Sequence, residues 1–230
     1  MGRVLGRREA SGAVEGDGWR FLLGSLQGVV VVGALERGAR LVVEVVAACG
    51  EDAGGHLRVD VRGDRVVFTL QSVERAWVTE RDVELARLIS GVVAKAGLVL
   101  GPEIGVGAGR SVQVVEIAID AMDIAGVRPF WKAVLGYADE AGADGSEDPL
   151  VDPVGQGPAV WFQQMDRERP QRNRIHFDVC VPHDEAERRV EGALAAGGHL
   201  VSAERAPAFW VLADREGNEA CVTTWQGRDS

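Results

Sequence analysis

An internal repeat in the C-terminal half constrains the fold of this chain more than any other feature of its sequence. A strand pattern that includes Glu116 leads into a helix pattern that ends at Gly136, and a strand pattern that includes His176 leads into a helix pattern that ends at Gly197. Each copy then continues with further strand patterns. Because a repeated unit indicates architecture more strongly than any single motif does, we expect strand, helix and several strands, twice over.

The first strand of the second copy displays a histidine. Apolar residues alternate along this strand at Ile175, Phe177, Val179 and Val181. This period of two predicts one buried face and puts His176 on the other face. If that other face lines a concave sheet, His176 points into a cavity, and the function is to be sought there.

The N-terminal half shows a different order of elements. Its patterns predict strand, strand, helix, strand, strand and helix, over Trp19–Leu23, Leu26–Val32, Ala34–Cys49, Leu57–Val61, Arg65–Leu70 and a segment that follows Thr79. Thr79 with Asp82 three residues later is the pattern of a helix N-terminus. The fold class expected for the whole chain is therefore α+β.

Composition and charge divide the chain into four expected segments: a flexible arm over 1–18, an α+β domain over 19–100, a linker over 101–111 and a second domain over 112–230. The linker is rich in Gly and Pro, which prevent regular structure. Residues 1–100 hold 13 basic and 13 acidic side chains and residues 101–230 hold 12 and 22, so the net charge of −10 falls in the second part. Such a split indicates separate units.

Composition also excludes several classes of function. A net charge of −10 argues against nucleic-acid binding, which needs a basic face. No apolar run approaches the roughly 20 residues that span a bilayer, so we expect no membrane partner. The three cysteines, Cys49, Cys180 and Cys221, have no CxxC spacing, which favours a reducing cytoplasm. The expected partner is a small-molecule substrate or ligand.

The C-terminal half resembles the vicinal oxygen chelate superfamily, which has the fold of glyoxalase I, extradiol dioxygenases and bleomycin-resistance proteins. The resemblance rests on Asp123 with Arg128–Tyr137, on the strand around His176, and on Leu212–Cys221. It implies a paired βαβββ glyoxalase-like domain whose two modules close into a cup.

The same resemblance implies metal ligands on the first and last strand of each module. Carried onto this sequence, these positions are Glu116, Gln164 (or its neighbour Gln163), His176 and Cys221, where most metal-binding relatives have Glu at the last one. A divalent metal (Zn, Fe, Mn or Ni) is the cofactor that the family implies. The alternative is a metal-free cavity, in which Glu116 and His176 serve as acid and base or hydrogen-bond a ligand.

Tryptophans are frequent in this half of the chain. A cup for a small molecule would use their large apolar faces, and the candidate ligand-binding residues are Trp131, Trp161, Trp210 and Trp225. The alternative interpretation is that they fill the core of a small domain.

The N-terminal half resembles pterin-4a-carbinolamine dehydratase, through Gly18-Trp19, Val59–Val66 and Val78–Arg87. That family uses a His-His-Pro run and a third His in a Thr-His-Asp segment, because its reaction needs proton transfer near neutral pH. Here the first run is Gly55-His56-Leu57 and the second is Ser72-Val73-Glu74, so only His56 is kept. The resemblance therefore implies a degenerate, inactive site, unless Glu74 has taken over the missing role.

Three functions follow as hypotheses. The first is a small-molecule protein, leaning towards a lyase- or isomerase-type enzyme, that acts in the C-terminal cup beside an inactive dehydratase-like domain. The second is a non-catalytic, ligand-sequestering protein of the resistance type. The third is an active 4a-hydroxytetrahydrobiopterin dehydratase with a rebuilt site. Both resembled families commonly self-associate, which implies a homo-oligomer.

Overall fold

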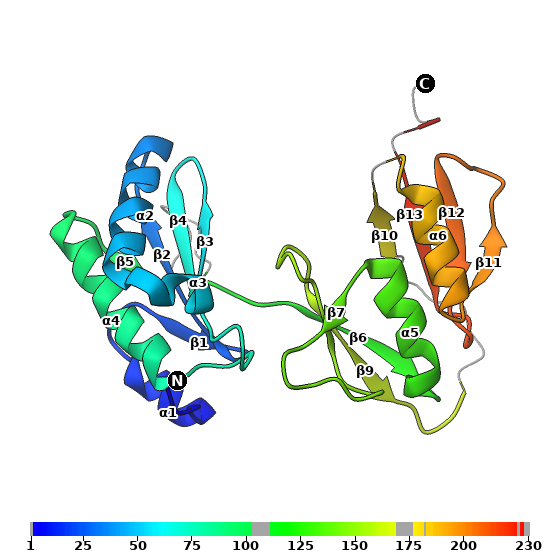
Figure 1. The fold of residues 1–230 in the computed structure, drawn as a ribbon, viewed down its shortest axis with the longest axis horizontal. Coiled ribbons are helices and arrows are strands. Elements are labelled where there is room, and N and C mark those ends of the chain that lie inside the picture. The colour runs from blue at the N-terminus through cyan, green and yellow to red at the C-terminus, as the bar shows by residue number, and fades with distance from the viewer. Residues whose placement is uncertain (1, 103–110, 169–176, 182, 225, 228–230) are drawn as a thin grey trace. The chain divides into compact units, whose positions relative to one another are not determined.

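The computed structural model describes residues 2–102, 111–168, 177–181, 183–224 and 226–227. The chain forms two compact units, Met1–Val114 and Val115–Ser230. Helices and sheets are mixed in both units, so the expected α+β class is confirmed (Figure 1).

Unit 1 is built around an antiparallel sheet in the order β1-β2-β4-β3, with β5 paired to β2. Its elements are α1 (Arg7–Ala13), β1 (Arg20–Leu22), β2 (Ser25–Val31), α2 (Leu35–Cys49), η1 (Gly50–Asp52), α3 (Ala53–His56), β3 (Leu57–Val61), β4 (Arg65–Leu70), α4 (Glu80–Lys95) and β5 (Leu100–Gly101). The order strand, strand, helix, strand, strand, helix agrees with the expectation from sequence. The short elements α1, α3 and β5 were not expected.

The core of unit 1 lies between its two long helices and the sheet. Leu41 and Val45 of α2 and Ile89 of α4 share one buried cluster with Val30 and Phe68 of the sheet. Burying side chains of this size contributes about 1.5–3 kcal/mol each. This packing fixes α4, and hence its first turn, against the sheet.

The N-terminal segment differs from the expected flexible arm. It forms α1, and Leu5, Ala10 and Val14 are almost fully buried in the core of unit 1. The apolar residues Ala10 and Val14 are four positions apart, the spacing that puts two side chains on one face of a helix. They stand among Gly, Arg and Glu residues, which make the segment look polar. These three buried side chains hold the segment in place, although its average composition is that of a flexible tail.

Unit 2 contains the repeat in full. The first module is β6 (Glu116–Ala121), α5 (Ile124–Leu135), β7 (Ala138–Asp139), β8 (Leu150–Val151) and β9 (Ala159–Gln164), with sheet order β6-β9-β8-β7. The second is β10 (Phe177–Cys180), α6 (Ala186–Ala195), β11 (His199–Ser202), β12 (Phe209–Ala213) and β13 (Glu219–Thr223), with order β10-β13-β12-β11. In each module the first and last strands are parallel neighbours. Two βαβββ modules of the same topology confirm the expected architecture.

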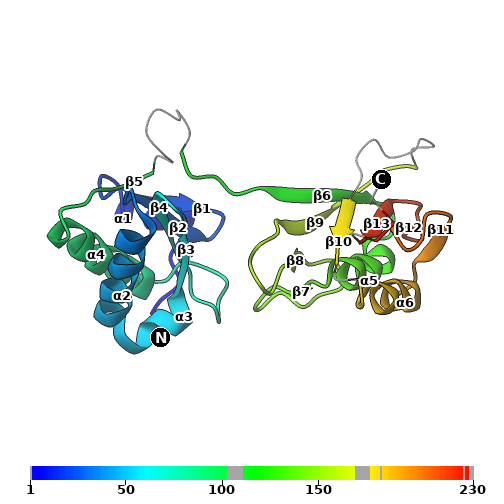
Figure 2. The same cartoon turned by 90° about the horizontal axis from the view of Figure 1, so that it is seen from above.

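The two modules of unit 2 share one core. Helices α5 and α6 lie side by side on the same side of the sheets (Figure 2). Trp131 of α5 packs edge-on against Phe177 of β10, with ring centroids 5.3 Å apart. Gly136 ends α5 in the left-handed conformation at φ 70°, as its position predicted, and Gly197 follows α6 at φ 96°.

Candidate functional site

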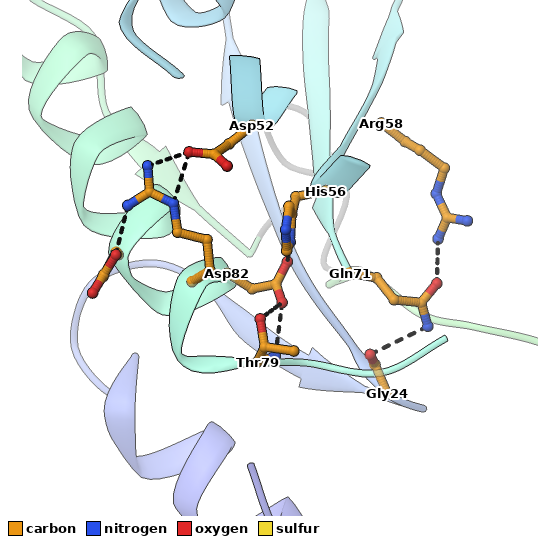
Figure 3. Close-up of polar contacts among 9 residues, drawn as sticks. Gly24, Asp52, His56, Arg58, Gln71, Thr79 and Asp82 are labelled. Carbon is orange, nitrogen blue, oxygen red and sulfur yellow. Dashed lines mark hydrogen bonds and ion pairs between the residues drawn. The ribbon is translucent and has the colours of Figure 1, made fainter. Parts of the chain in front are cut away.

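A histidine and a fully buried carboxylate form a polar pair in unit 1. His56, the last residue of α3, places its Nδ1 2.9 Å from Oδ1 of Asp82 in α4 (Figure 3). The Asp82 side chain is fully buried and the His56 side chain is 18% exposed. Because a carboxylate only accepts hydrogen bonds, Nδ1 carries the proton, and Nε2 is the nitrogen left for a ligand or a transferred proton.

The Asp82 side chain is held in place by the helix cap that it forms with Thr79. Its Oδ2 accepts hydrogen bonds from the backbone N–H and the hydroxyl of Thr79, both at 2.7 Å. Thr79 and Asp82 form a capping box at the start of α4, as expected. One carboxylate therefore holds both the first turn of α4 and the imidazole ring.

The two segments at the positions of the dehydratase histidines, 55–57 and 72–74, lie side by side. Val73 N–H donates to Gly55 C=O at 2.9 Å, and Gln71 N–H donates to His56 C=O at 2.9 Å. The Val73 side chain is 62% exposed and brings no polar group to the site. Glu74 forms its ion pair with Arg75 at 4.0 Å, so His56 and Asp82 are the acid–base groups that the structure joins.

Gln71, next to the segment 72–74, forms hydrogen bonds to two turns that have strained backbone angles. Its Nε2 donates to the Gly24 carbonyl (3.2 Å), and its Oε1 accepts from Arg58 (3.2 Å) (Figure 3). The same Nε2 also donates to the Ala76 carbonyl at 2.9 Å. Ala76 has φ 47° and Leu23, beside Gly24, has φ 41°, which cost of order 1–3 kcal/mol each for residues with a side chain. Gln71 therefore stabilises backbone that would otherwise relax.

In unit 2 the candidate site is the face of the two sheets opposite α5 and α6, here called the open face. Ile117 and Ile119 of β6 and Val160 of β9 point into the core, so alternate residues point the other way. By the strand registers, the open face includes Glu116, Ala118 and Asp120 of β6, Trp161 and Gln163 of β9, Asp178 and Cys180 of β10, Phe209 and Val211 of β12, and Glu219, Cys221 and Thr223 of β13. It is the face that the sequence analysis named as the lining of a cavity, on the condition that the sheet is concave.

Part of the open face is shielded from solvent although neither α5 nor α6 covers it. Cys221 is 7% exposed and Thr223 is 5% exposed, whereas their neighbour Val222 points into the core. Both residues lie on a central strand, between Asp178 and Cys180 of β10 and Val211 and Phe209 of β12. Neighbouring side chains on the same face therefore shield the open face at β13.

Glu140 is a candidate site residue that the sequence did not indicate. Asp139 of β7 points towards α5, where it pairs with Arg128 (2.7 Å) and Lys132 (2.5 Å), so the next residue turns to the open face. Burial raises the pKa of the Glu140 carboxyl, and the nearby carboxylates of Glu116 and Asp148 raise it further. Residues 137–158 lack apolar periodicity, so no pattern in the sequence could single this residue out.

The raised pKa of Glu140 predicts the pH dependence of a variant. Because folding raises this pKa above its ordinary value of 4.5, the folded state loses stability as the pH rises through that range. Glu140→Gln is therefore expected to unfold at a higher temperature than the wild type at neutral pH, with the difference shrinking as the pH falls towards 4.5. Thermal melts across this pH range measure the effect, and Glu147→Gln, in an exposed loop, is the control. A difference independent of pH would contradict the assignment.

The remaining predicted residues lie in different surroundings. Trp131 is buried in the core, 1% exposed, with its indole N–H on Asp214 at 3.0 Å, and Trp210 packs against the same core. Trp161 is the half-buried tryptophan of the open face. His176 and Trp225 lie outside the described residues. Their ligand-binding roles stay predictions.

The predicted metal ligands are not gathered by the described part of the chain. Gln164 is in register with the core residue Ala121, and its Nε2 donates to the carbonyls of Met122 (3.0 Å) and Met165 (3.1 Å). It therefore lies on the face opposite Glu116. Among the described residues no group of three or more His, Cys, Asp or Glu side chains could hold a metal ion. Of the predicted ligands, Glu116 and Gln164 therefore do not combine into the implied metal site, and His176 lies outside the described residues.

The paired βαβββ modules of unit 2 lie in the part of the chain that a family model matches. Residues 116–223 match the family described as a glyoxalase-like domain. No curated protein matches the chain in sequence. None of the helices in the described ranges is both long and apolar enough to cross a membrane.

Several solved structures are similar to the chain. One is a glyoxalase/bleomycin resistance protein/dioxygenase family enzyme from Burkholderia phytofirmans PsJN, with 18% identity over 47% of this chain and 95% of that chain and a TM-score of 0.40. Another is the fosfomycin resistance protein FosX from Mesorhizobium loti, with 11% identity, 50% and 92% coverage and a TM-score of 0.39. A transcriptional coactivator/pterin dehydratase from Brucella melitensis has 19% identity, 39% and 98% coverage and a TM-score of 0.36.

Proposed function

We propose that the chain is a small-molecule-binding protein whose ligand is held on the open face of unit 2, with chemistry of the lyase or isomerase type at that face. The observation that carries this proposal is the shielding of polar groups on a sheet face that neither α5 nor α6 covers. Cys221 and Thr223 are buried there, and Glu140 is half-buried beside Glu116. A concave face with a few convergent polar groups is the usual form of a ligand site.

The charge of this face favours some ligands over others. The charged residues of its described strands are acidic, Glu116, Asp120, Asp178 and Glu219, and Glu140 adds a fifth carboxyl group. Such a surface attracts cationic organic molecules, tolerates neutral ones and repels anions. Glu140, with its raised pKa, is the group suited to hold a proton and give it to a bound ligand.

Binding by the purified full chain tests the proposal. A panel of neutral, cationic and anionic small molecules is screened by thermal shift and then by calorimetry, with bound metal measured by elemental analysis. Glu116→Gln is expected to weaken binding about tenfold or more, because a hydrogen bond to a charged group contributes about 1.5–3 kcal/mol. The exposed Glu147→Gln is the matched control. Equal loss in both variants would contradict a site at Glu116.

Turnover separates the two versions of this function. An enzyme consumes the bound molecule, whereas a sequestering protein of the resistance type binds it in stoichiometric amount and returns it unchanged. The proposal of an enzyme fails if every ligand that binds tightly is recovered intact. Self-association of the chain, as the resembled families imply, is checked by light scattering on the same samples.

A second candidate function is supported by the pair of His56 and Asp82. An imidazole held by a buried carboxylate can move a proton near neutral pH, as the dehydration of a 4a-carbinolamine requires. In that reaction the C–O bond breaks, water leaves, and the nitrogen loses its proton as the C=N bond forms. A dehydratase assay that compares the wild-type chain with His56→Asn tests this candidate function. Equal dehydration rates in the two proteins would rule it out.

A further inference from the structure

The N-terminal segment forms an additional backbone pairing with the start of α4. Leu5 N–H donates to Val78 C=O at 3.0 Å, and Glu80 N–H donates to Arg3 C=O at 2.9 Å. Val4 and Thr79 form an antiparallel bridge between these two bonds. Residues 2–5, here called the strap, therefore lie directly on the residues that begin α4.

Side chains fasten the strap at both ends. Arg3 contacts Glu80 at 3.0 Å and Glu9 at 2.6 Å, and the Leu5 carbonyl accepts the indole N–H of Trp77 at 2.8 Å. Leu5 is 4% exposed, within the core of unit 1. The strap is thus anchored in the core on one side and by ion pairs on the other.

The strap also approaches the helix closely. A Cβ atom at Gly2 would lie 2.9 Å from the backbone nitrogen of Arg81, which is closer than real Cβ atoms come to such an atom. Only a residue without a side chain fits there in this geometry. The backbone of the strap therefore runs in contact with the first turn of α4.

The strap completes the cap of α4. The first N–H groups of a helix have no partner within it. Here the Arg3 carbonyl accepts a hydrogen bond from the N–H of Glu80, and the Asp82 carboxylate accepts one from the N–H of Thr79. Asp82 holds His56 with its other oxygen. A displacement of the first turn of α4 would therefore move the carboxylate on which the imidazole orientation depends.

We propose that the strap is a positioning element for His56, and that it acts through the first turn of α4 and Asp82. Release of the strap frees the first turn of α4, weakens the contact between Asp82 and His56, and lets the imidazole change tautomer. The functional consequence rests on the second candidate function, in which His56 transfers a proton. The structural consequence stands independently of it.

The test compares glycine variants of the full chain by NMR. Gly2→Ala forces the strap away from Arg81, whereas Gly6→Ala is the matched control because a Cβ at Gly6 meets nothing within 4 Å. In Gly2→Ala the hydrogen exchange of the Asp82 amide, which is bonded to Thr79 C=O, is expected to speed up about tenfold, the factor for losing one backbone hydrogen bond. The ¹⁵N signals of His56, assigned with His56→Gln, are expected to show loss of the Nδ1–H tautomer.

Deletion of residues 2–4 is the second variant, which keeps Leu5 and α1. It is expected to shift exchange and tautomer in the same direction and further than Gly2→Ala. The proposal is overturned if both variants keep wild-type exchange at Asp82 and a wild-type His56 spectrum, or if Gly6→Ala changes them equally. A wild-type chain without dehydratase activity, in which Gly2→Ala still changes the His56 tautomer, supports the strap and removes only the second candidate function.

Discussion

Asp82→Asn is expected to lower the free energy of unfolding of unit 1 by about 2–4 kcal/mol, from the loss of a helix cap and of hydrogen bonds to a charged group. The Asp82 carboxylate is fully buried and accepts from Thr79 N, Thr79 Oγ1 and His56 Nδ1. An amide at this place turns an NH₂ group towards at least one of these donors. Urea unfolding of the full chain, followed by circular dichroism, measures the loss.

Asp60→Asn is the control for this prediction. Asp60 is half exposed and pairs with Arg62 at 2.9 Å on the surface of unit 1. Exposed pairs of this kind contribute about 0.2–1 kcal/mol. If Asp82→Asn costs no more than Asp60→Asn, then Asp82 does not hold the start of α4, and the account of His56 fails with it.

Asp214→Ala is expected to lower the free energy of unfolding of unit 2 by about 3–5 kcal/mol, because four hydrogen-bond donors lose a buried carboxylate. Asp214 is fully buried. It accepts from Trp131 Nε1 at 3.0 Å, from Glu216 N and Asn218 N at 2.9 Å, and from Asn218 Nδ2 at 2.7 Å. Unfolding followed by tryptophan fluorescence measures the loss.

The same substitution is expected to weaken the link between the two modules of unit 2. The turn that Asp214 organises carries Glu216, whose carboxylate accepts from Met122 N (2.7 Å) and Asp123 N (2.6 Å) at the start of α5. Trp131→Phe removes only the indole donor and is expected to cost less than half as much. Equal losses in the two variants would show that the turn adds nothing beyond its bond to Trp131. The exposed Glu191→Ala, on α6, is expected to leave stability unchanged.

The repeat in unit 2 was predictable because its signals are local and occur twice. Alternation of apolar residues set the strands, and Gly136 and Gly197 marked where the helices stop. The capping box of Thr79 and Asp82 was predictable for the same reason, since its two members are three residues apart. Periodicity and caps are short-range properties that a sequence displays directly.

The site residues were harder to predict because their partners are distant in the chain. Asp82 was expected as a helix cap, but its contact with His56 spans 26 residues and depends on how α3 meets α4. Glu140 is half-buried near Glu116 of another strand, a proximity that no local pattern encodes. For Trp131 and Trp210, residue type alone could not separate a ligand contact from a core contact.

The most direct test of the central claim is to map a bound ligand on the full chain by hydrogen exchange and by the indole N–H signal of Trp161. The account predicts protection of β6, β9 and β13 and a shifted Trp161 signal on addition of a neutral or cationic ligand found in the screen. Glu116→Gln should abolish both changes at the same ligand concentration. Protection confined to unit 1, with Trp161 unmoved, would contradict the proposal that unit 2 holds the ligand on its open face.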